Sequence, residues 1–453
     1  MKIEETKRIQ DYFKILKKEP LLYQAVKQVT KEIEAEERIQ DDYVFARSLY
    51  LTVLAPVLVS FVEWVLTEAQ KRRIKRLYFL ARDGYQMYIA ARYICEKKKI
   101  PIECRYLYAS RYAWRMPQFA FLGEKSLDMI CCGGIDVTFQ KVMKRGGLTE
   151  EESLEIAEEL GFLDKYKEVL SYSAVLQLKE PLKKNVKFLN YVYEHSKKSY
   201  QTTIAYLKQE GVFETIPYAL VDSGWTGSLQ QTLTQLLRCA GCEKKLEGFY
   251  FGLYELPSKV EKSAYHAYFF SPGFEMKRKV YFSNCLYEVV YSAPHGMTVG
   301  YAWEQGNYGP IFYSRYNLNQ GYMEREAIWL KSFLQYYQGH KSNKKLCYQL
   351  LKKMMGQPTK EEVELYGNLL FSDDVTEEQL QCVAESFTKA EIKNHYVWNR
   401  ILIMLGLKKQ MLKDSAWLEG SIVMVEEGNK WKLLHVRWYK YLIYLRKWLK
   451  RGT

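Results

Sequence analysis

Four short β-prone segments alternate with helix-like segments in the first 255 residues, and this alternation constrains the fold more than any other feature of the sequence. They cover residues 74–80, 102–110, 216–222 and 246–255. The first three lead into loops that carry small and charged residues, and helical patterns separate the segments. Strands that alternate with helices in this way form parallel sheets covered by helices. The sequence therefore predicts an α/β core built on a parallel sheet.

The regions on both sides of this core have helical patterns. Residues 1–75 contain no glycine and are rich in Lys, Glu, Leu and Ala, which predicts a helical N-terminal segment. We expect the core to occupy residues 76–315, with loops and short strands over the aromatic stretch 256–312. A helical C-terminal region over 316–425 and a basic amphipathic tail helix over 426–453 complete the expected organisation.

The apolar and cysteine patterns favour a cytoplasmic protein. The longest apolar run, residues 51–66, is shorter than the ~20 residues that span a bilayer, and because it contains Pro56 and Glu63 we expect a buried helix. The first residues do not resemble a secretory signal, and nine scattered cysteines suit a reducing compartment. Cys239 and Cys242 form a C-x-x-C pair without further ligands nearby, which favours a structural role over a metal or redox centre.

Small polar residues and glycines follow the third predicted strand, where the next helix begins. Amide N–H groups at a helix start, joined by hydroxyl groups, bind a phosphate monoester, and a strand-end carboxylate would then face hydroxyl groups or a metal ion. The alternative is that a Ser or Thr only caps the helix and the aspartate only ends the strand. The residues concerned are Asp222, Ser223, Gly224, Thr226, Gly227 and Ser228.

Two further polar sites follow the first and second predicted strands. Arg82, Asp83 and Gly84 end the first strand, and Ser110 and Arg111 end the second. The planar donors of arginine match the paired oxygens of a pyrophosphate. Because the carboxyl ends of parallel strands share one edge of the sheet, these residues are expected near the phosphate loop. The alternative for Arg111 is an ordinary surface arginine.

Four segments together resemble a known family. The segments LYFLARDGY and VDSGWTGSLQQTL, residues 77–85 and 221–233, are similar to the pyrophosphate loop and the ribose-5-phosphate loop of type I phosphoribosyltransferases. With residues 107–117 and 291–301 they resemble a phosphoribosyltransferase-like domain of bacterial capsule and surface-polysaccharide clusters. That domain is commonly fused to, or encoded beside, a haloacid-dehalogenase-type (HAD) phosphatase. The four segments span about half of the chain.

The resemblance implies a type I phosphoribosyltransferase-like core. It implies an enzyme that transfers ribofuranose 5-phosphate from phosphoribosyl pyrophosphate (PRPP) to a glycan acceptor and releases pyrophosphate. It further implies Mg²⁺ bound with PRPP, an acceptor on a lipid carrier, and a separate HAD phosphatase that removes the 5-phosphate. The implied roles are pyrophosphate binding by Arg82, the Gly84 amide and Arg111, ribose binding by Asp222, and 5-phosphate binding by Thr226, Gly227 and Ser228.

The sequence departs from the family pattern in one loop and lacks the phosphatase signature. The family loop has paired acidic residues before its Thr-Gly segment, whereas Ser223 takes the second position here and leaves Asp222 alone to hold the ribose hydroxyls. The D-x-D-x-T signature of HAD phosphatases is missing, since Asp41-Asp42 and Asp373-Asp374 do not fit it. This chain is therefore not expected to be the phosphatase.

An acceptor hydroxyl also needs a base, for which the sequence offers three candidates. Asp83 is one, with the alternatives of orienting its loop or binding a metal ion through water. Glu288 is the second, and its alternative is an ion pair with a lysine. His295 is the third, and its alternative is to shape the turn between Pro294 and Gly296.

The tail is basic and amphipathic. Eight Lys or Arg and no acidic residue lie between Asn429 and Thr453. A basic face combined with a Trp-bearing apolar face favours binding to an anionic membrane surface, here the inner face of the cell membrane. The alternative is a helix docked on its own core with a solvated basic face. The apolar stripe consists of Leu434, Trp438, Tyr441, Leu442, Leu445, Trp448 and Leu449, with Arg437, Lys440, Lys447, Lys450 and Arg451 around the other side.

The charge balance leaves two rival functions open. The 67 Lys and Arg against 53 Asp and Glu give a net charge of +14, which favours an anionic partner. A nucleic-acid-binding protein would also be basic and aromatic, but no recognised nucleic-acid motif is present, so nucleic acid is not an expected partner. A catalytically silent scaffold, or a subunit associated with the HAD phosphatase, within a polysaccharide-synthesis complex is the second rival.

Overall fold

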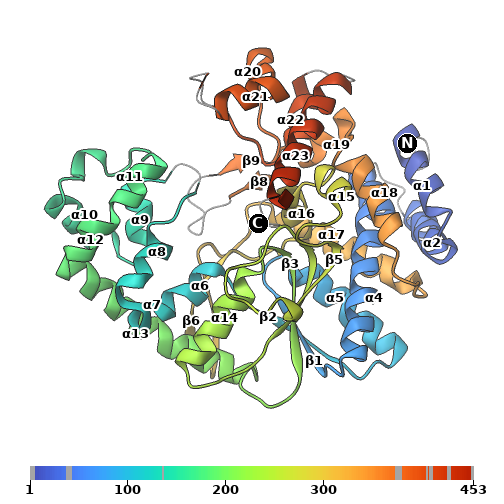
Figure 1. The fold of residues 1–453 in the computed structure, drawn as a ribbon. Coiled ribbons are helices and arrows are strands. Elements are labelled where there is room, and N and C mark those ends of the chain that lie inside the picture. Colours follow the sequence, from blue (N-terminus) through green and yellow to red (C-terminus); the bar gives the residue numbers. More distant parts are fainter. Residues whose placement is uncertain are drawn as a thin grey trace.

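A five-stranded parallel sheet forms the centre of the computed structural model (Figure 1). The strand order is β2-β1-β3-β4-β5, which confirms the predicted α/β class. The strands are β1 (Arg76–Leu80), β2 (Glu103–Leu107), β3 (Tyr218–Trp225), β4 (Glu247–Leu253) and β5 (Tyr265–Phe270). The structure describes residues 6–36, 43–134, 137–372, 380–404, 407, 412–425 and 430–449.

Alternating side chains of the strands pack against helices on opposite faces of the sheet. Leu77 and Phe79 of β1 share a core with α4 (Ala55–Lys71) and α5 (Gly84–Lys98). Tyr78 and Leu80 point the other way and share a second core with α13 (Val186–Gln209) and α14 (Ser228–Cys239). Because both faces are covered, the strands are apolar along their whole length, as parallel strands usually are.

The N-terminal residues form helices that pack on the first face. The helices are α1 (Lys7–Leu16), α2 (Pro20–Glu36), α3 (Val44–Leu49) and a π-helical turn, Tyr50–Leu54, that leads into α4. Within the described residues, Val44–Lys71 is the one helix long and apolar enough to span a membrane, and 94% of its most apolar stretch is buried in the protein. The apolar run at 51–66 is therefore a core helix, as predicted.

A helical subdomain is inserted between β2 and β3 and has its own hydrophobic core. It lies to one side of the sheet, as the teal and green helices of Figure 1. The long helix α13 joins it to the sheet, because residues of α13 contribute to both cores. Its shorter helices are α6 (Arg111–Arg115), α7 (Phe119–Leu122), α8 (Leu127–Ile130), α9 (Phe139–Arg145), α10 (Glu150–Glu159), α11 (Tyr172–Gln177) and α12 (Lys179–Lys184).

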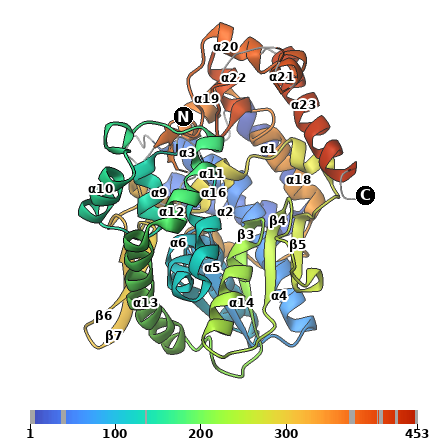
Figure 2. The same cartoon turned by 60° about the vertical axis from the view of Figure 1, so that its left-hand side comes forward.

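The C-terminal region is mostly helical and packs on the same face as the N-terminal helices. One core unites the N-terminal helices, one face of the sheet and helices up to α23, so packing does not follow the boundaries expected near residues 76 and 316. Figure 2 shows α23 at the outer edge of the molecule. The elements after β5 are α15 (Met276–Val280), α16 (Asn284–Tyr291), the hairpin β6 (Thr298–Glu304) and β7 (Asn307–Phe312), α17 (Gln320–Tyr336), α18 (Lys344–Met354), α19 (Lys360–Tyr366), the pair β8 (Leu370–Phe371) and β9 (Gln381–Cys382), α20 (Lys389–Asn394), α21 (Val397–Met404), α22 (Leu418–Val425) and α23 (Lys430–Leu449).

Candidate functional site

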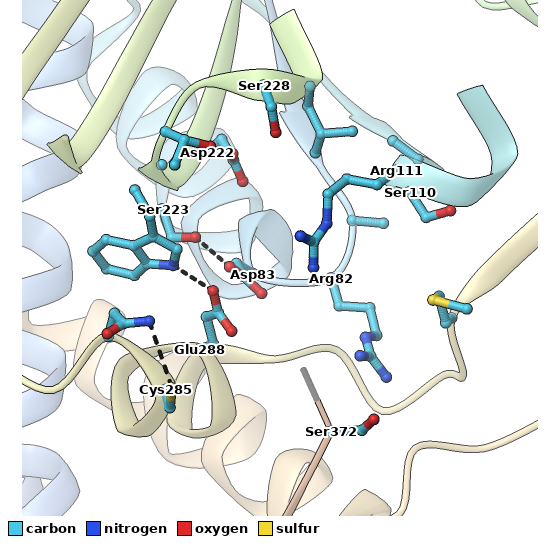
Figure 3. Close-up of a pocket in the computed structure, with 18 of the residues that line it drawn as sticks. Arg82, Asp83, Ser110, Arg111, Asp222, Ser223, Ser228, Cys285, Glu288 and Ser372 are labelled. Carbon is cyan, nitrogen blue, oxygen red and sulfur yellow. Dashed lines mark hydrogen bonds between the residues drawn. The ribbon is translucent and has the colours of Figure 1, made fainter. Parts of the chain in front are cut away.

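A cavity of about 370 Å³ lies at the carboxyl ends of β1 and β3 (Figure 3). Strand β1 pairs with β2 on one side and with β3 on the other, so the chain order of the sheet reverses at this point. In open α/β sheets ligands bind in the crevice beyond such a reversal, where the loops on either side diverge. We call this space the switch-point cavity.

Most of the residues predicted from the sequence line the switch-point cavity. They come from the loop after β1, from the start of α6 after β2, from the last residues of β3 and the start of α14, and from α16. Strand β3 continues to Trp225, past the predicted strand end at Asp222, so Asp222, Ser223 and Gly224 belong to the strand itself. The predicted residues in its wall are Arg82, Asp83, Ser110, Arg111, Asp222, Ser223, Gly224, Thr226, Ser228 and Glu288. Gly84 and Gly227 are buried next to the wall, and His295 is not part of it.

Two arginines form the cationic side of the cavity. In Figure 3 the guanidinium groups of Arg82 and Arg111 lie opposite the carboxyl groups. Among the described residues none forms an ion pair with Arg111. Ser110 lines the cavity, but its hydroxyl accepts the Ala113 amide at 2.9 Å and donates to the Thr298 carbonyl at 2.6 Å. Ser110 therefore caps the first turn of α6 and positions Arg111, which differs from the substrate-binding role expected for it.

Three carboxyl groups form the opposite side. The Ser223 hydroxyl donates a hydrogen bond to Asp83, and the Trp225 indole N–H donates one to Glu288. These bonds tie the loop after β1 and helix α16 to the end of β3. Asp222 is 8% exposed and accepts hydrogen bonds from the amides of Ser223 and Gly224.

Burial raises the pKa of each of the three carboxyl groups, and for two of them the charge of Asp83 adds to the rise. Desolvation, followed by the charge of Asp83, raises the pKa of Asp222 to about 8. The same two causes raise the pKa of Glu288 to about 8. Desolvation also raises the pKa of Asp83, while Ser223, Arg82 and Arg111 oppose the rise. With pKa values of about 8, Asp222 and Glu288 are largely protonated near neutral pH, and a bound cation would favour their ionised forms.

The backbone from the end of β3 to the start of α14 lines the cavity. Gly224 has φ +111°, and a Cβ there would come within 2.4 Å of the Gly252 carbonyl oxygen on β4, so only glycine fits. Gly227 precedes α14 with φ +64° and provides no side-chain cap for the first amides of that helix. Within the described part of the chain, no protein group bonds to the hydroxyls of Thr226 and Ser228. This arrangement suits an anion at the helix N-terminus.

His295 is held by other groups and is not an acceptor-side base in this structure. Its Nδ1 donates to the Gly296 carbonyl at 2.8 Å, and its Nε2 accepts the Tyr106 hydroxyl at 2.8 Å. The ring also stacks on Phe312 with centroids 4.8 Å apart. Desolvation lowers the pKa of His295 to about 4. Both ring nitrogens are thus occupied by protein groups, and the ring supports the wall behind the cavity. These contacts favour a structural role for His295 over the catalytic role that was one of its expected options.

Several wall residues were not predicted. Their elements follow β3 by at least 59 residues in the chain, and no local pattern in the sequence marks them as neighbours of the strand ends. Helix α16 contributes Asn284 and Cys285 beside Glu288, and β8 with the residue after it contributes Phe371 and Ser372. The unpredicted wall residues are Asn284, Cys285, Met297, Phe371 and Ser372.

The remaining expectations from the sequence concern the cysteines and metal ligands. All nine cysteines lie within the described residues, and none forms a disulfide, including Cys239 and Cys242. In the described ranges, no group of three His, Cys, Asp or Glu side chains is arranged to hold a metal ion. The acidic pairs at 41–42 and 373–374 lie outside the described residues.

Two comparisons with known proteins give no match that would assign a function to this cavity. No protein-family model matches the chain, and no curated protein matches it either. The chemistry of the cavity therefore provides the basis for a functional assignment.

Proposed function

We propose that the switch-point cavity binds PRPP and that the protein is a phosphoribosyltransferase-type glycosyltransferase of surface or capsular polysaccharide synthesis. The observation that carries this proposal is the division of one cavity into three parts. The cations Arg82 and Arg111 suit a pyrophosphate, the carboxyl groups suit a ribose diol, and the uncapped start of α14 suits a 5-phosphate. PRPP carries these three groups in this order. The type I phosphoribosyltransferase core is part of the same proposal.

The contacts around Ser223, near the end of β3, would bring a second acid beside Asp222. Ser223 takes the place of a second loop acid, and its hydroxyl donates to Asp83 from the neighbouring loop. The charge of Asp83 is close enough to Asp222 to raise its pKa. Asp222 and Asp83 together would accept hydrogen bonds from the ribose hydroxyls, in place of two adjacent acids on one loop.

The carboxyl groups fit a Mg²⁺ ion that enters with the pyrophosphate. Mg²⁺ prefers oxygen ligands and is usually held by one or two carboxylates together with substrate phosphates and water. Asp83 and Asp222 are desolvated carboxyl groups whose ionised forms a cation would stabilise. The Mg²⁺ ion would neutralise charge on the departing pyrophosphate.

In the proposed reaction, the residues of the cavity stabilise the charge of the leaving group and hold the donor in place. The acceptor oxygen forms a bond to C1 of the ribose while the bond from C1 to the pyrophosphate oxygen breaks, and the electron pair leaves with pyrophosphate. Arg82 and Arg111 stabilise that negative charge, and the start of α14 holds the other end of the donor still. The Glu288 carboxylate, oriented by Trp225, accepts the proton of the acceptor hydroxyl.

The first test is calorimetric titration of PRPP with Mg²⁺ into the full-length protein. We expect micromolar binding, weakened at least about tenfold by either Arg82→Ala or Asp222→Asn, since each removes a charge-assisted contact. Arg238→Ala is the matched control, because its side chain is exposed at the far end of α14 in a surface ion pair with Glu243.

The outcome separates the proposed enzyme from the rival scaffold. Binding that survives in both cavity variants would place PRPP elsewhere and overturn the assignment. Folded protein that takes up neither PRPP nor pyrophosphate would support a catalytically silent member of a polysaccharide-synthesis complex.

A further inference from the structure

Helix α23 docks on the protein through its basic side. Arg437 donates to the Gly356 carbonyl at 2.9 Å, and Lys440 pairs with the buried Glu419 at 2.6 Å. Leu433 and Val436 are buried between α23 and the rest of the protein. This is the reverse of the docked alternative considered from the sequence, in which the basic side would be solvated.

The apolar stripe of α23 therefore points away from the protein. Trp431 is 76% exposed and Trp438 is 57% exposed. A soluble helix normally buries its apolar stripe, and exposed stripes of this kind mark interaction surfaces. The exposed apolar residues of α23, which we call the outer stripe, are Trp431, Leu434, Trp438, Tyr441, Leu442, Trp448 and Leu449.

Neighbouring segments add exposed aromatic residues beside the outer stripe. Helix α21 packs against α23 and presents Trp398 to solvent, and Tyr396, directly before α21, stacks on His435 with centroids 4.5 Å apart. At the other end of α23, the loop that carries the exposed Phe274 lies against Trp448. The apolar surface thus extends beyond a single helix.

The charge of this region is positive. Helix α23 has six Lys or Arg residues and no acidic residue. Lys430 and Arg446 are exposed, and helical spacing places them at the two margins of the outer stripe. Lys277 is exposed on α15, which packs against α23. An aromatic stripe between cationic margins matches the interface of an anionic bilayer, where Trp and Tyr lie at the headgroups.

We propose that the outer stripe of α23 binds the surface of an anionic lipid membrane, with the helix lying in the plane of the interface. A second copy of the chain is a poorer occupant, because two outer stripes would bring two cationic helices together. Among the described helices, the one that is both long and apolar enough to span a bilayer is buried in the core, so α23 would hold the protein as a peripheral one.

The docked side of α23 connects this surface to the switch-point cavity. Tyr444 stacks on Tyr254 with centroids 5.7 Å apart, and Tyr254 contacts Trp225 in the cavity wall. A protein bound through the outer stripe therefore holds its cavity near the lipid. Resting on the proposed function, this position fits an acceptor glycan attached to a lipid carrier in the same membrane.

Vesicle co-sedimentation of the full-length protein tests the proposal. The wild type should bind vesicles of phosphatidylcholine with phosphatidylglycerol more tightly than vesicles of phosphatidylcholine alone. The triple variant Trp438→Ser, Leu442→Ser and Trp448→Ser should bind at least about tenfold more weakly. Lys430→Gln and Arg446→Gln should each weaken binding about fivefold, and only on the anionic vesicles. Trp303→Ser on the β6–β7 hairpin, equally exposed but remote in the fold, is the control.

Three results would overturn the proposal. They are a wild type that stays in solution with anionic vesicles, a triple variant that binds like the wild type, and a control that loses binding as the triple variant does. A wild type that sediments as a dimer which the triple variant dissociates, without vesicle binding, would assign the outer stripe to self-association. Because no substrate is present, a failure here leaves the proposed enzyme activity untouched.

Discussion

Replacing Asp222 with asparagine is expected to stabilise the protein at alkaline pH while it removes the carboxylate that we propose binds the ribose. Burial and the charge of Asp83 raise the pKa of Asp222 to about 8. In an unfolded chain an aspartate has a pKa of about 3.9. Between these two values the folded protein holds a proton that the unfolded chain has released, so the free energy of unfolding falls as the pH rises.

The loss of unfolding free energy that the Asp222 carboxyl causes depends on how far the pH lies above its pKa in the unfolded chain. Each pH unit above 3.9 costs at most about 1.4 kcal/mol, which gives about 1.5 kcal/mol at pH 5 and about 4 kcal/mol at pH 7 as upper limits. An asparagine at position 222 keeps an oxygen for the amides of Ser223 and Gly224 but carries no charge. The variant should therefore gain stability over the wild type progressively as the pH rises from 5 to 8.

Thermal unfolding of both proteins at pH 5 and pH 8 provides the assay. We expect the unfolding midpoint of Asp222→Asn to exceed that of the wild type by several degrees at pH 8 and by much less at pH 5. Asp128→Asn is the control, because the Asp128 side chain is 75% exposed. A variant that is less stable than the wild type at both pH values, or whose difference does not change with pH, would refute the reasoning.

Three further substitutions test separate parts of the site. Gly224→Ala should lower the free energy of unfolding by about 2 kcal/mol or more, since its φ is +111° and a Cβ would meet the Gly252 carbonyl; an unchanged unfolding midpoint would contradict this. Trp225→Phe removes the hydrogen bond that lowers the pKa of Glu288, the proposed base, so the rising limb of the pH profile for PRPP turnover should move to higher pH, and an unshifted limb would argue against this role of Trp225. Arg111→Ala should weaken binding of inorganic pyrophosphate about tenfold in calorimetry, and more at low salt; equal affinity would remove Arg111 from the site.

The strand ends and their polar loops were predictable because the information for them is local. Short apolar runs, Leu77–Leu80 in β1 and Tyr218–Val221 in β3, lead into polar residues, and a parallel sheet places such ends at one edge. That reasoning was sufficient to bring Arg82, Arg111 and Asp222 to one cavity. The relation of Ser223 to Asp83 was not predictable, since it depends on how two neighbouring loops approach each other.

The parts that were predicted less sharply depend on contacts between distant segments. The sequence predicted short strands somewhere in the aromatic stretch 256–312, and β5 forms there where Tyr268, Phe269 and Phe270 are buried in the core. His295 has the chemistry of a base, but Tyr106 and Gly296 occupy both of its ring nitrogens.

The orientation of the tail helix also depended on the structure. The sequence identified the apolar and basic sides of α23 but left open which of them docks. Buried Glu419 is a partner for Lys440 that no local pattern in the tail reveals, and it fixes the basic side inward.

Hydrogen–deuterium exchange with the separate parts of the donor tests most directly whether the two loops of the switch-point cavity hold the two ends of PRPP. Pyrophosphate with Mg²⁺ should slow amide exchange at residues 81–85, ribose 5-phosphate should slow it at residues 225–230, and PRPP with Mg²⁺ should slow it at both. Unchanged exchange in both loops with PRPP, or protection confined to another part of the protein, would contradict the proposed donor site.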